Sequence, residues 1–315
     1  MHPLVRNGVA GESVTPPGKL QSALEVSFDG DGQYGCGPES VDEFLPGPGL
    51  SPGEALLREG KRIAVATCDP VQEAERRVGR IDEVIQAFGE SARRAMEWGF
   101  DAVQLHAAHG YLINQFLSPL TNRRMDQYGG SVENRRRFLM EAYRSIRSAV
   151  GPKFPVLVKL NGADYLEHAL AIEDAVLAAQ ALEAEGIDAI EVSSGTPASK
   201  DKVPVRQKID TREQEAYNLD LAVRVKQAVS CPVMVVGGLR SFDLISEIIT
   251  SGKADYVSLA RPFIREPGLV KRWQGGDMGR ATCISCNGCY RPGLKGLGIA
   301  CVVEQAERKK AGKAG

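Results

Sequence analysis

The residues QLHAAHGYLINQFLSP, at positions 104–119, decide the fold of this chain. A mostly apolar run at residues 101–105 overlaps their start, and its composition predicts a short buried strand. His106, His109 and Tyr111 follow this strand, so two imidazoles and a phenol lie within one short turn. Parallel α/β folds carry their chemistry at the carboxyl ends of strands, which makes these side chains candidates for a functional site.

The same alternation of apolar strands and amphipathic helices continues along the chain. The predicted strands cover residues 101–105, 155–160, 188–193, 232–236 and 255–259. The predicted helices cover residues 81–96, 133–150, 171–185, 215–229 and 242–250, with Gly186 just after the third. Apolar strands that alternate with helices predict a parallel sheet with right-handed crossovers. We therefore expect an α/β fold of the (β/α)8 TIM-barrel type, for which about 250 residues is typical.

The start of the chain differs from the rest, so we divide the sequence into three parts. The first 60 residues hold 11 Gly and 7 Pro, a composition typical of low-complexity sequence. Short strand-like runs occur there at 24–28 and 62–68, although a closed barrel needs three strands before residue 101. We expect an atypical segment at 1–77, which either completes the barrel or leaves it incomplete, a barrel core at 78–280 and a cysteine-rich segment at 281–315.

Composition limits the classes of partner. The formal net charge is −1, which gives no electrostatic reason to expect binding to nucleic acid or to an anionic membrane. No apolar run approaches the ~20 residues that span a bilayer, and the first residues have no apolar signal-peptide core. We expect a cytoplasmic protein that acts on a small molecule, with a homo-oligomer as one form. Seven cysteines in that compartment favour thiols or metal ligands over disulfides.

The decisive stretch, with NRRMDQYGGSVENRRRF at 122–138, resembles the FMN-dependent old yellow enzyme family and its dienoyl-CoA reductase and trimethylamine dehydrogenase relatives. Looser resemblance covers residues 156–165, 190–196, 232–240 and 254–267. It implies an FMN barrel that uses NAD(P)H to reduce the activated C=C bond of an α,β-unsaturated carbonyl compound. Family members normally supply a residue beside flavin N5 and a glutamine from earlier strands, and this sequence places neither. The alternative is a non-catalytic or unstable barrel remnant that binds flavin weakly or works only in a complex.

The resemblance gives roles to the three residues after the first strand. His106 and His109 are implied to bind the carbonyl oxygen of the substrate, where donors stabilise developing negative charge. The alternatives are histidines bonded to backbone carbonyls, or a metal pair without a third ligand. Tyr111 is implied to give a proton to the α-carbon, because a phenol with a pKa near 10 is protonated at neutral pH. The alternative for Tyr111 is an ordinary core aromatic.

The flavin contacts are implied on three later strands. Lys159 stands where the family has a cation near flavin N1 and O2, and the alternative is a lysine at a strand end that reaches solvent. The turns after the last two strands are where such barrels bind phosphate, and plain strand-to-helix turns are the alternative. The implied phosphate residues are Gly237, Gly238, Ala260 and Arg261.

Four late cysteines, Cys283, Cys286, Cys289 and Cys301, have the spacing C-x2-C-x2-C-x11-C. Clustered thiolates favour an iron–sulfur cluster or zinc, and the pattern resembles the 4Fe–4S segment of the trimethylamine dehydrogenase branch. Thiols without a metal are the third interpretation. The other cysteines have no such spacing and are expected to be free.

Two further segments are rich in charge. Residues 194–218 follow a strand without apolar periodicity, and include Arg206 and Tyr217. They form either a loop over the barrel mouth or an exposed linker. The arginine run at 135–137 is expected on a solvated helix face.

Overall fold

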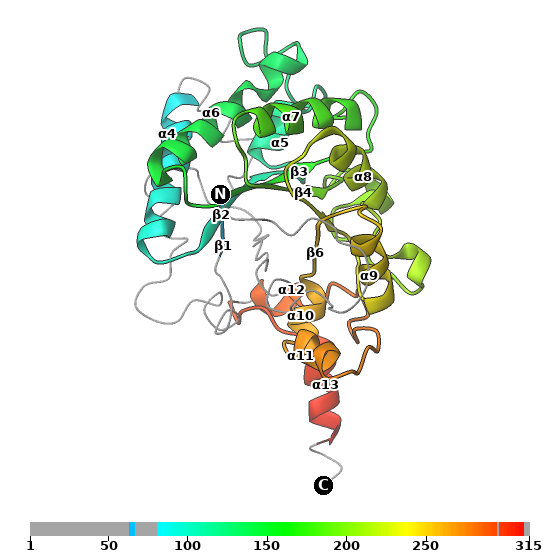
Figure 1. The fold of residues 1–315 in the computed structure, drawn as a ribbon. Helices are drawn as coiled ribbons and strands as arrows, with labels where there is room; N and C mark the ends of the chain where they lie inside the picture. The colour runs from blue at the N-terminus through cyan, green and yellow to red at the C-terminus, as the bar shows by residue number, and fades with distance from the viewer. Residues whose placement is uncertain (1–62, 67–80, 295, 312–315) are drawn as a thin grey trace, which may run out of the picture.

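Six parallel strands form one sheet in the order of the sequence, β1-β2-β3-β4-β5-β6 (Figure 1). The computed structural model describes residues 63–66, 81–294 and 296–311. Its strands are β1 (Ile63–Ala66), β2 (Ala102–Ala107), β3 (Val156–Asn161), β4 (Ala189–Ser193), β5 (Val233–Val236) and β6 (Tyr256–Ser258). A sheet that grows in one direction is wound as in a barrel, whereas a doubly wound sheet reverses its strand order. The five strands predicted after residue 100 are confirmed, and the run at 24–28 lies outside the described residues.

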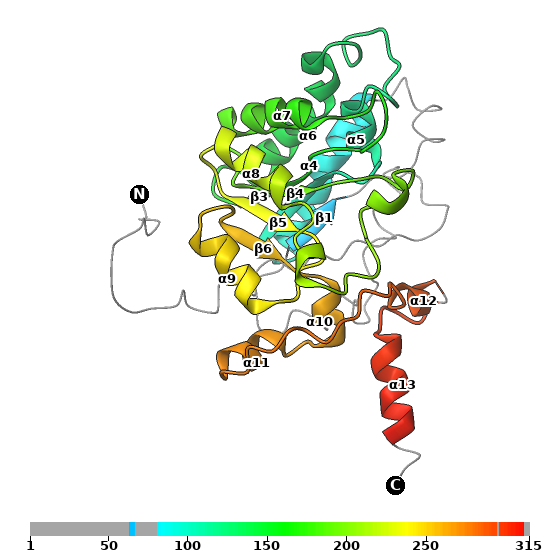
Figure 2. The same ribbon diagram turned by 90° about the vertical axis from the view of Figure 1, so that its right-hand side faces the viewer.

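Helices cover the outer face of this sheet (Figures 1 and 2). They are α4 (Ile81–Glu97), α5 (Leu112–Leu117), α6 (Val132–Val150), α7 (Ile172–Ala184), α8 (Leu219–Ala228) and α9 (Phe242–Thr250). Short 3₁₀ turns lie at Lys200–Lys202 and Arg212–Gln214. The later helices are α10 (Arg261–Arg265), α11 (Leu269–Gln274), α12 (Tyr290–Gly293) and α13 (Val302–Ala311). Figure 2 shows α11, α12 and α13 at one end of the barrel, where α13 extends away from it.

Side chains alternate between the inner and the outer face along each strand, and both faces of the sheet are buried. Outward residues such as Leu105, Val158 and Ile190 join the large core between sheet and helices. A smaller apolar cluster forms separately, from Ala102, Leu157, Ala189 and Met234 with Tyr256 packed against it. The positions after this cluster on β2, β3 and β4 carry polar side chains, and these build the site described below.

Most element ends follow local sequence. Gly186 follows α7 with φ of 84°, its N–H bonds to the Glu183 carbonyl, and the Ile187 N–H bonds to that of Leu182, as in a Schellman motif. The predicted start of α8 at residue 215 is wrong, because the helix begins at Leu219. The cause is tertiary: the Glu215 carboxylate accepts bonds from residues after β5 instead of entering the helix.

The arginine run does not lie wholly on a solvated face. Arg135 is 8% exposed and donates to the carbonyl oxygens of Leu117 and Gly130 and to the Asp174 carboxylate. Its fork therefore ties α6 to the end of α5 and to α7. A five-donor guanidinium can satisfy several buried carbonyls at once, which the local sequence pattern does not reveal.

Helices α4 and α6 approach closely at Gly89, and this contact gives a stability prediction. A Cβ at Gly89 would lie 2.9 Å from the Ser145 carbonyl oxygen of α6. We expect Gly89→Ala to lower the free energy of unfolding by about 1–3 kcal/mol, the usual cost of overpacking, despite alanine's better helix propensity. Urea unfolding measures this, and Gly293→Ala is the control, since its Cβ meets no atom closer than 3.8 Å. Equal effects of the two substitutions would contradict the close packing.

Candidate active site

A row of polar side chains crosses the barrel interior at one level. His106 on β2 is in register with Lys159 on β3, which is in register with Glu191 on β4. All three are at most 2% exposed. Lys159 Nζ lies 3.4 Å from Glu191 Oε2, and Gln104 Nε2 donates to the same oxygen at 2.9 Å. Lys159 therefore does not reach solvent, so the alternative of a solvated strand-end lysine is wrong.

Sequence reasoning missed Gln104 and Glu191, although a signal was available. Both stand at inward positions of otherwise apolar strands, AVQLHA and AIEVS. A charged or amide side chain at such a position is rarely buried without a partner. Searching for that partner on the neighbouring strand would have paired Glu191 with Lys159.

His106 is a neutral imidazole whose ring N–H has no partner among the described residues. Its Nδ1 accepts the N–H of Ala108 at 3.2 Å, which assigns the ring proton to Nε2. Burial, assisted by the charge of Lys159, lowers the pKa of His106 to about 3. The Nε2–H group is buried and has no partner among the described residues. A buried donor without a partner costs about 1–3 kcal/mol, so this atom is suited to an acceptor on a ligand.

His109 lies in a left-handed turn beside His106. Its φ is 64°, and the two ring centroids are 5.0 Å apart at 78°. Its backbone N–H points to Asn161 Oδ1 at 3.4 Å, and its Nε2 lies 2.7 Å from Ser193 Oγ. Burial, with smaller effects of His106 and Lys159, holds the pKa of His109 well below its usual value. Both imidazoles are therefore neutral at physiological pH.

A buried network of hydrogen-bonded polar side chains supports the turn that contains His109. Asn114 Oδ1 accepts the Gly110 N–H at 2.6 Å, and its Nδ2 donates to Asp164 Oδ1 at 3.2 Å. Asn161 Nδ2 donates to the same Asp164 oxygen at 2.7 Å. All three side chains are at most 2% exposed. The network fixes the unusual backbone of the turn, and sequence reasoning gave these residues no role.

Tyr111 completes the predicted trio. It is the residue before the first turn of α5, and its ring meets His106 edge-on with centroids 4.8 Å apart. The structure therefore brings together all three residues predicted to be catalytic. Tyr111 itself is half-buried.

The turn after β5 has glycines for a reason that differs from the expected one. Gly237 and Gly238 have φ of 148° and 71°, and a Cβ on either would lie 3.1 Å from the ring of Tyr217. The glycines thus admit this ring, in addition to any close approach of a ligand. The Arg206 guanidinium carbon lies 4.1 Å from the centroid of the Tyr217 ring, so part of the 194–218 loop packs on this turn. The interpretation of that whole segment as an exposed linker is wrong.

Several arginine side chains lie near this turn after β5. Arg261 begins α10 just after Ala260 and donates to the Arg206 carbonyl at 2.9 Å. Arg206 Nε, and Arg240 Nε and Nη2, are buried without a partner among the described residues. Burial, with repulsion from the Arg280 guanidinium, lowers the pKa of Arg240. Guanidinium donors left open in this way fit an anion such as a phosphate.

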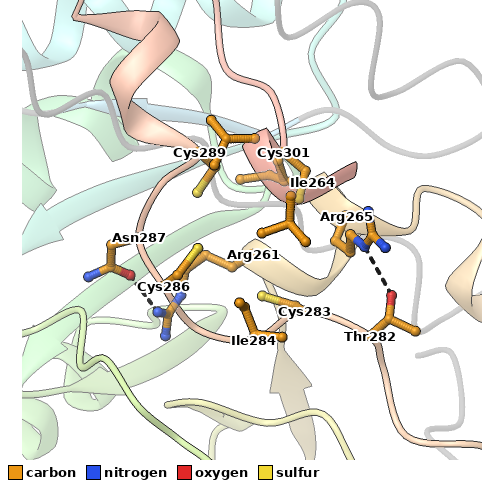
Figure 3. Close-up of a pocket in the computed structure, with 12 residues that line it drawn as sticks. Arg261, Ile264, Arg265, Thr282, Cys283, Ile284, Cys286, Asn287, Cys289 and Cys301 are labelled. Atoms are coloured by element: carbon orange, nitrogen blue, oxygen red, sulfur yellow. Dashed lines mark hydrogen bonds between the residues drawn. The ribbon is translucent and has the colours of Figure 1, made fainter. Parts of the chain in front are cut away.

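The four late cysteines line one cavity together with Arg261 and Asn287 (Figure 3). Even so, no three His, Cys, Asp or Glu side chains in the described part of the chain are arranged to hold a metal ion. The thiols as placed in the described residues therefore do not fit the expected 4Fe–4S cluster. Among the helices of the described ranges, none combines the length and apolar character needed to cross a membrane.

Comparisons with known proteins identify the class to which this barrel belongs. The model of the NADH:flavin oxidoreductase / NADH oxidase family matches residues 59–278. An NADH oxidase of Thermoanaerobacter brockii is 38% identical over 220 residues, which cover 69% of this chain and 33% of that protein. An NADPH dehydrogenase of Bacillus pumilus is 37% identical over 274 residues, 84% of this chain and 77% of that protein. This chain therefore belongs to the NADH:flavin oxidoreductase / NADH oxidase family, and the predicted family is confirmed.

Solved structures agree with the fold. A 2-naphthoyl-CoA reductase in complex with 2-naphthoyl-CoA matches with a TM-score of 0.61 and 31% identity, over 70% of this chain and 33% of that one. An old yellow enzyme homologue from Zymomonas mobilis matches with a TM-score of 0.53 and 26% identity, over 66% of this chain and 56% of that one. The (β/α)8-type fold is confirmed. The chain spans 33%, 34% and 52% of the length of three curated relatives.

The neutral state of buried His106 predicts a pH dependence of stability. Its pKa is about 3 when folded and about 6.5 when unfolded, so the unfolded state takes up the proton first. The contribution of neutral His106 to the free energy of unfolding is complete above pH 6.5. It falls as the pH drops toward 3, by up to about 1.4 kcal/mol per pH unit. We expect His106→Gln to flatten this acid limb in urea unfolding between pH 6.5 and 4.5. His168→Gln is the control, because His168 is exposed; equal slopes in both variants would reject the buried neutral state.

Proposed function

We propose that this chain is an FMN-dependent oxidoreductase that uses NAD(P)H to reduce the activated C=C bond of an α,β-unsaturated carbonyl compound. The observation that carries the proposal is the buried Nε2–H of His106, which has no described partner and lies beside His109 and Tyr111. A neutral donor in a water-poor site suits a carbonyl oxygen that gains negative charge during reaction. Membership of the flavin oxidoreductase family supplies the reaction class.

The residues present fit FMN at both ends of the site. Buried Lys159 offers a cation inside the barrel, suited to the pyrimidine edge of the flavin near N1 and O2. Arg261, with the backbone of Ala260, Gly237 and Gly238, offers a site for the phosphate where guanidinium donors are open. When bound, FMN would take hydride from NAD(P)H and pass it to the substrate. The protein's part is to orient both molecules and to tune their charge.

Two histidines polarise the carbonyl in this proposal. His106 donates from Nε2, as its bond from Ala108 requires. Ser193 lies 2.7 Å from Nε2 of His109, so a hydroxyl that donates there leaves the His109 proton on Nδ1. In that tautomer His109 supplies a second neutral donor. Two donors fixed in a buried site stabilise an oxyanion without the reorganisation that water would need.

Tyr111 supplies the proton. Its phenol is in edge contact with His106, which supports a role as the general acid that protonates the α-carbon of an enone. In this proposal the two imidazoles act on the carbonyl oxygen and the phenol acts on the α-carbon.

A cytoplasmic location and a homo-oligomer stay predictions. A metal at the four cysteines also stays a prediction, and assays for iron, sulfide and zinc on anaerobically purified protein test it.

The visible absorption spectrum of anaerobically purified protein tests the proposal. We expect flavin bands that bleach on addition of NADH or NADPH, and that return when 2-cyclohexenone is added. A colourless protein that stays colourless after incubation with FMN would contradict the proposal, and would favour the remnant that binds flavin weakly.

The proton-donor role predicts a split between the two half-reactions. Tyr111→Phe removes the acid and leaves the ring, so enone turnover should fall by about 10²–10⁴ while flavin reduction by NAD(P)H stays within about twofold. Stopped-flow absorbance measures the two rates separately. Tyr128→Phe is the matched control, because its hydroxyl donates to the Glu141 carboxylate of α6. Unchanged enone turnover in Tyr111→Phe would reject the role.

The buried ion pair predicts opposite shifts of the flavin potential. Lys159→Met removes the cation that stabilises anionic reduced flavin, so the midpoint potential should fall, whereas Glu191→Gln removes the counter-charge and should raise it. A change of 30 mV corresponds to about a tenfold change in a two-electron equilibrium, which dye-coupled titration resolves. The double variant, which removes both charges, should have a midpoint potential between those of the two single variants. Shifts of the same sign would show that the pair does not act on the flavin.

A further inference from the structure

One buried carboxylate joins the end of the 194–218 loop to the turn after β5. The side chain of Glu215 is fully buried. Its Oε2 accepts the backbone N–H groups of Arg240 and Ser241 at 2.7 and 2.9 Å. Its Oε1 accepts Ser241 Oγ and Arg280 Nε, each at 2.8 Å. All four donors come from segments that are distant in the sequence, so the carboxylate serves the turn after β5 and not the helix that follows it in the chain.

Arg280 compensates the charge of this carboxylate and ties it to the loop. While its Nε donates to Glu215, its other nitrogens donate to backbone carbonyl oxygens of the loop. These acceptors are Asp210 at 2.8 Å, with Ile209 and Thr211 at 3.4 Å. A carboxylate buried to this depth needs such a partner, because an unpaired buried charge is strongly unfavourable. The pair therefore keeps Glu215 ionised beside the turn.

The same bonds determine where Arg240 lies. Glu215 accepts the N–H of Arg240, and the carbonyl oxygen of Arg240 accepts the Ala281 N–H at 2.9 Å. The Nη1 group of Arg240 donates to the Cys283 carbonyl oxygen, whereas Nε and Nη2 are buried without a partner among the described residues. The backbone of Arg240 is thus held on both sides. Its two open donors therefore have a fixed place near the turn after β5.

Arg240 also lies close to the guanidinium expected at the phosphate. Burial, with repulsion from Arg280 and Arg261, lowers the pKa of Arg240. An anion bound near Arg240 and Arg261 would offset the repulsion between them. Guanidinium groups form strong charge-assisted hydrogen bonds with phosphate oxygens. The open donors of Arg240 therefore extend the anion site that Arg261 begins.

We propose that Glu215 is a positioning residue for the phosphate end of the site: it holds the backbone of Arg240, and so keeps two open guanidinium donors where the FMN phosphate binds. The inference rests on the proposed function, because it requires an FMN phosphate at the turn after β5. Glu215 itself acts only through Arg240. The proposal also gives a role to the end of the 194–218 loop, which carries this carboxylate.

Charge and position predict opposite effects when this carboxylate is removed. Glu215→Gln takes a negative charge away from the neighbourhood of the phosphate, which by charge alone would tighten FMN binding. An amide has one acceptor oxygen and one NH2 group, so two of the four donors lose their acceptor. The backbone of Arg240 is then no longer held from both sides. The positioning role therefore predicts weaker binding of FMN.

Titration of the flavin-free protein with FMN and with riboflavin, which lacks the phosphate, tests this role. We expect Glu215→Gln to raise the dissociation constant for FMN about tenfold, as for loss of one hydrogen bond to a charged group, and to leave that for riboflavin within about twofold. Quenching of flavin fluorescence measures both constants. Glu247→Gln is the matched control, because Glu247 lies on α9 and pairs with Arg212 at an exposed site. It should leave both constants within about twofold.

Glu215→Asp is a second variant, for the case in which the amide prevents folding. It keeps the charge and shortens the side chain by one methylene, so the carboxylate cannot reach Arg280 and both backbone N–H groups at once. The dissociation constant for FMN should rise several-fold, and that for riboflavin should again stay within about twofold. Urea unfolding shows that the variant used is folded.

The outcomes separate this inference from the proposed function. If the wild type binds FMN and the flavin bleaches with NAD(P)H, but a folded Glu215 variant binds FMN as tightly as the wild type or more tightly, the positioning role is overturned and the proposed function stands. If the affinities for FMN and riboflavin fall equally, Glu215 supports the barrel as a whole, and the inference is also overturned. If the wild type binds no FMN, both fall together.

Discussion

The site depends on one buried ion pair. Lys159 and Glu191 lie at the same level on neighbouring strands, each at most 2% exposed, and an unpaired charge at that depth would cost several kcal/mol. A slip of one residue in the pairing would move a charge to the face packed against helices, so the pair strongly specifies the register. That register also sets His106 against Lys159, where the positive charge adds to burial in keeping the imidazole neutral. The chemistry available to the histidine thus follows from how two strands align.

Rigidity of the turn after β2 comes from a different source. His109 has a backbone conformation that side chains rarely adopt, and such strain persists only where the surroundings over-determine it. Here Asn114, Asp164 and Asn161 are fully engaged with one another and with the turn. A satisfied polar network in a low-dielectric interior is stiff, because each bond lost leaves a buried group unpaired. The donors of the site are therefore placed before any ligand arrives.

Local sequence patterns were sufficient to predict the strand positions and the end of α7. Strand positions followed from apolar runs, and the end of α7 from Gly186. The errors arose where distant residues decide: Glu215 bonds to the turn after β5 and delays α8, and Arg135 is buried because three other segments supply its acceptors. The same holds for the site. His106 and Tyr111 were recognisable from their motif, whereas Glu191 acquires its role only through a neighbouring strand.

The two ends of the site differ in charge, and this difference sets how a ligand can lie. At one end, burial keeps His106 and His109 neutral, so they offer donors without attracting an anion strongly. At the other end, guanidinium groups near the turn after β5 have buried donors without a partner among the described residues. A molecule with a phosphate and a neutral ring system therefore has one favoured orientation. The cysteine segment touches Arg261 and Arg240 at the charged end. A change in that segment should accordingly act on how tightly such a molecule is held, and leave the polarising of a carbonyl at the neutral end to the strand register.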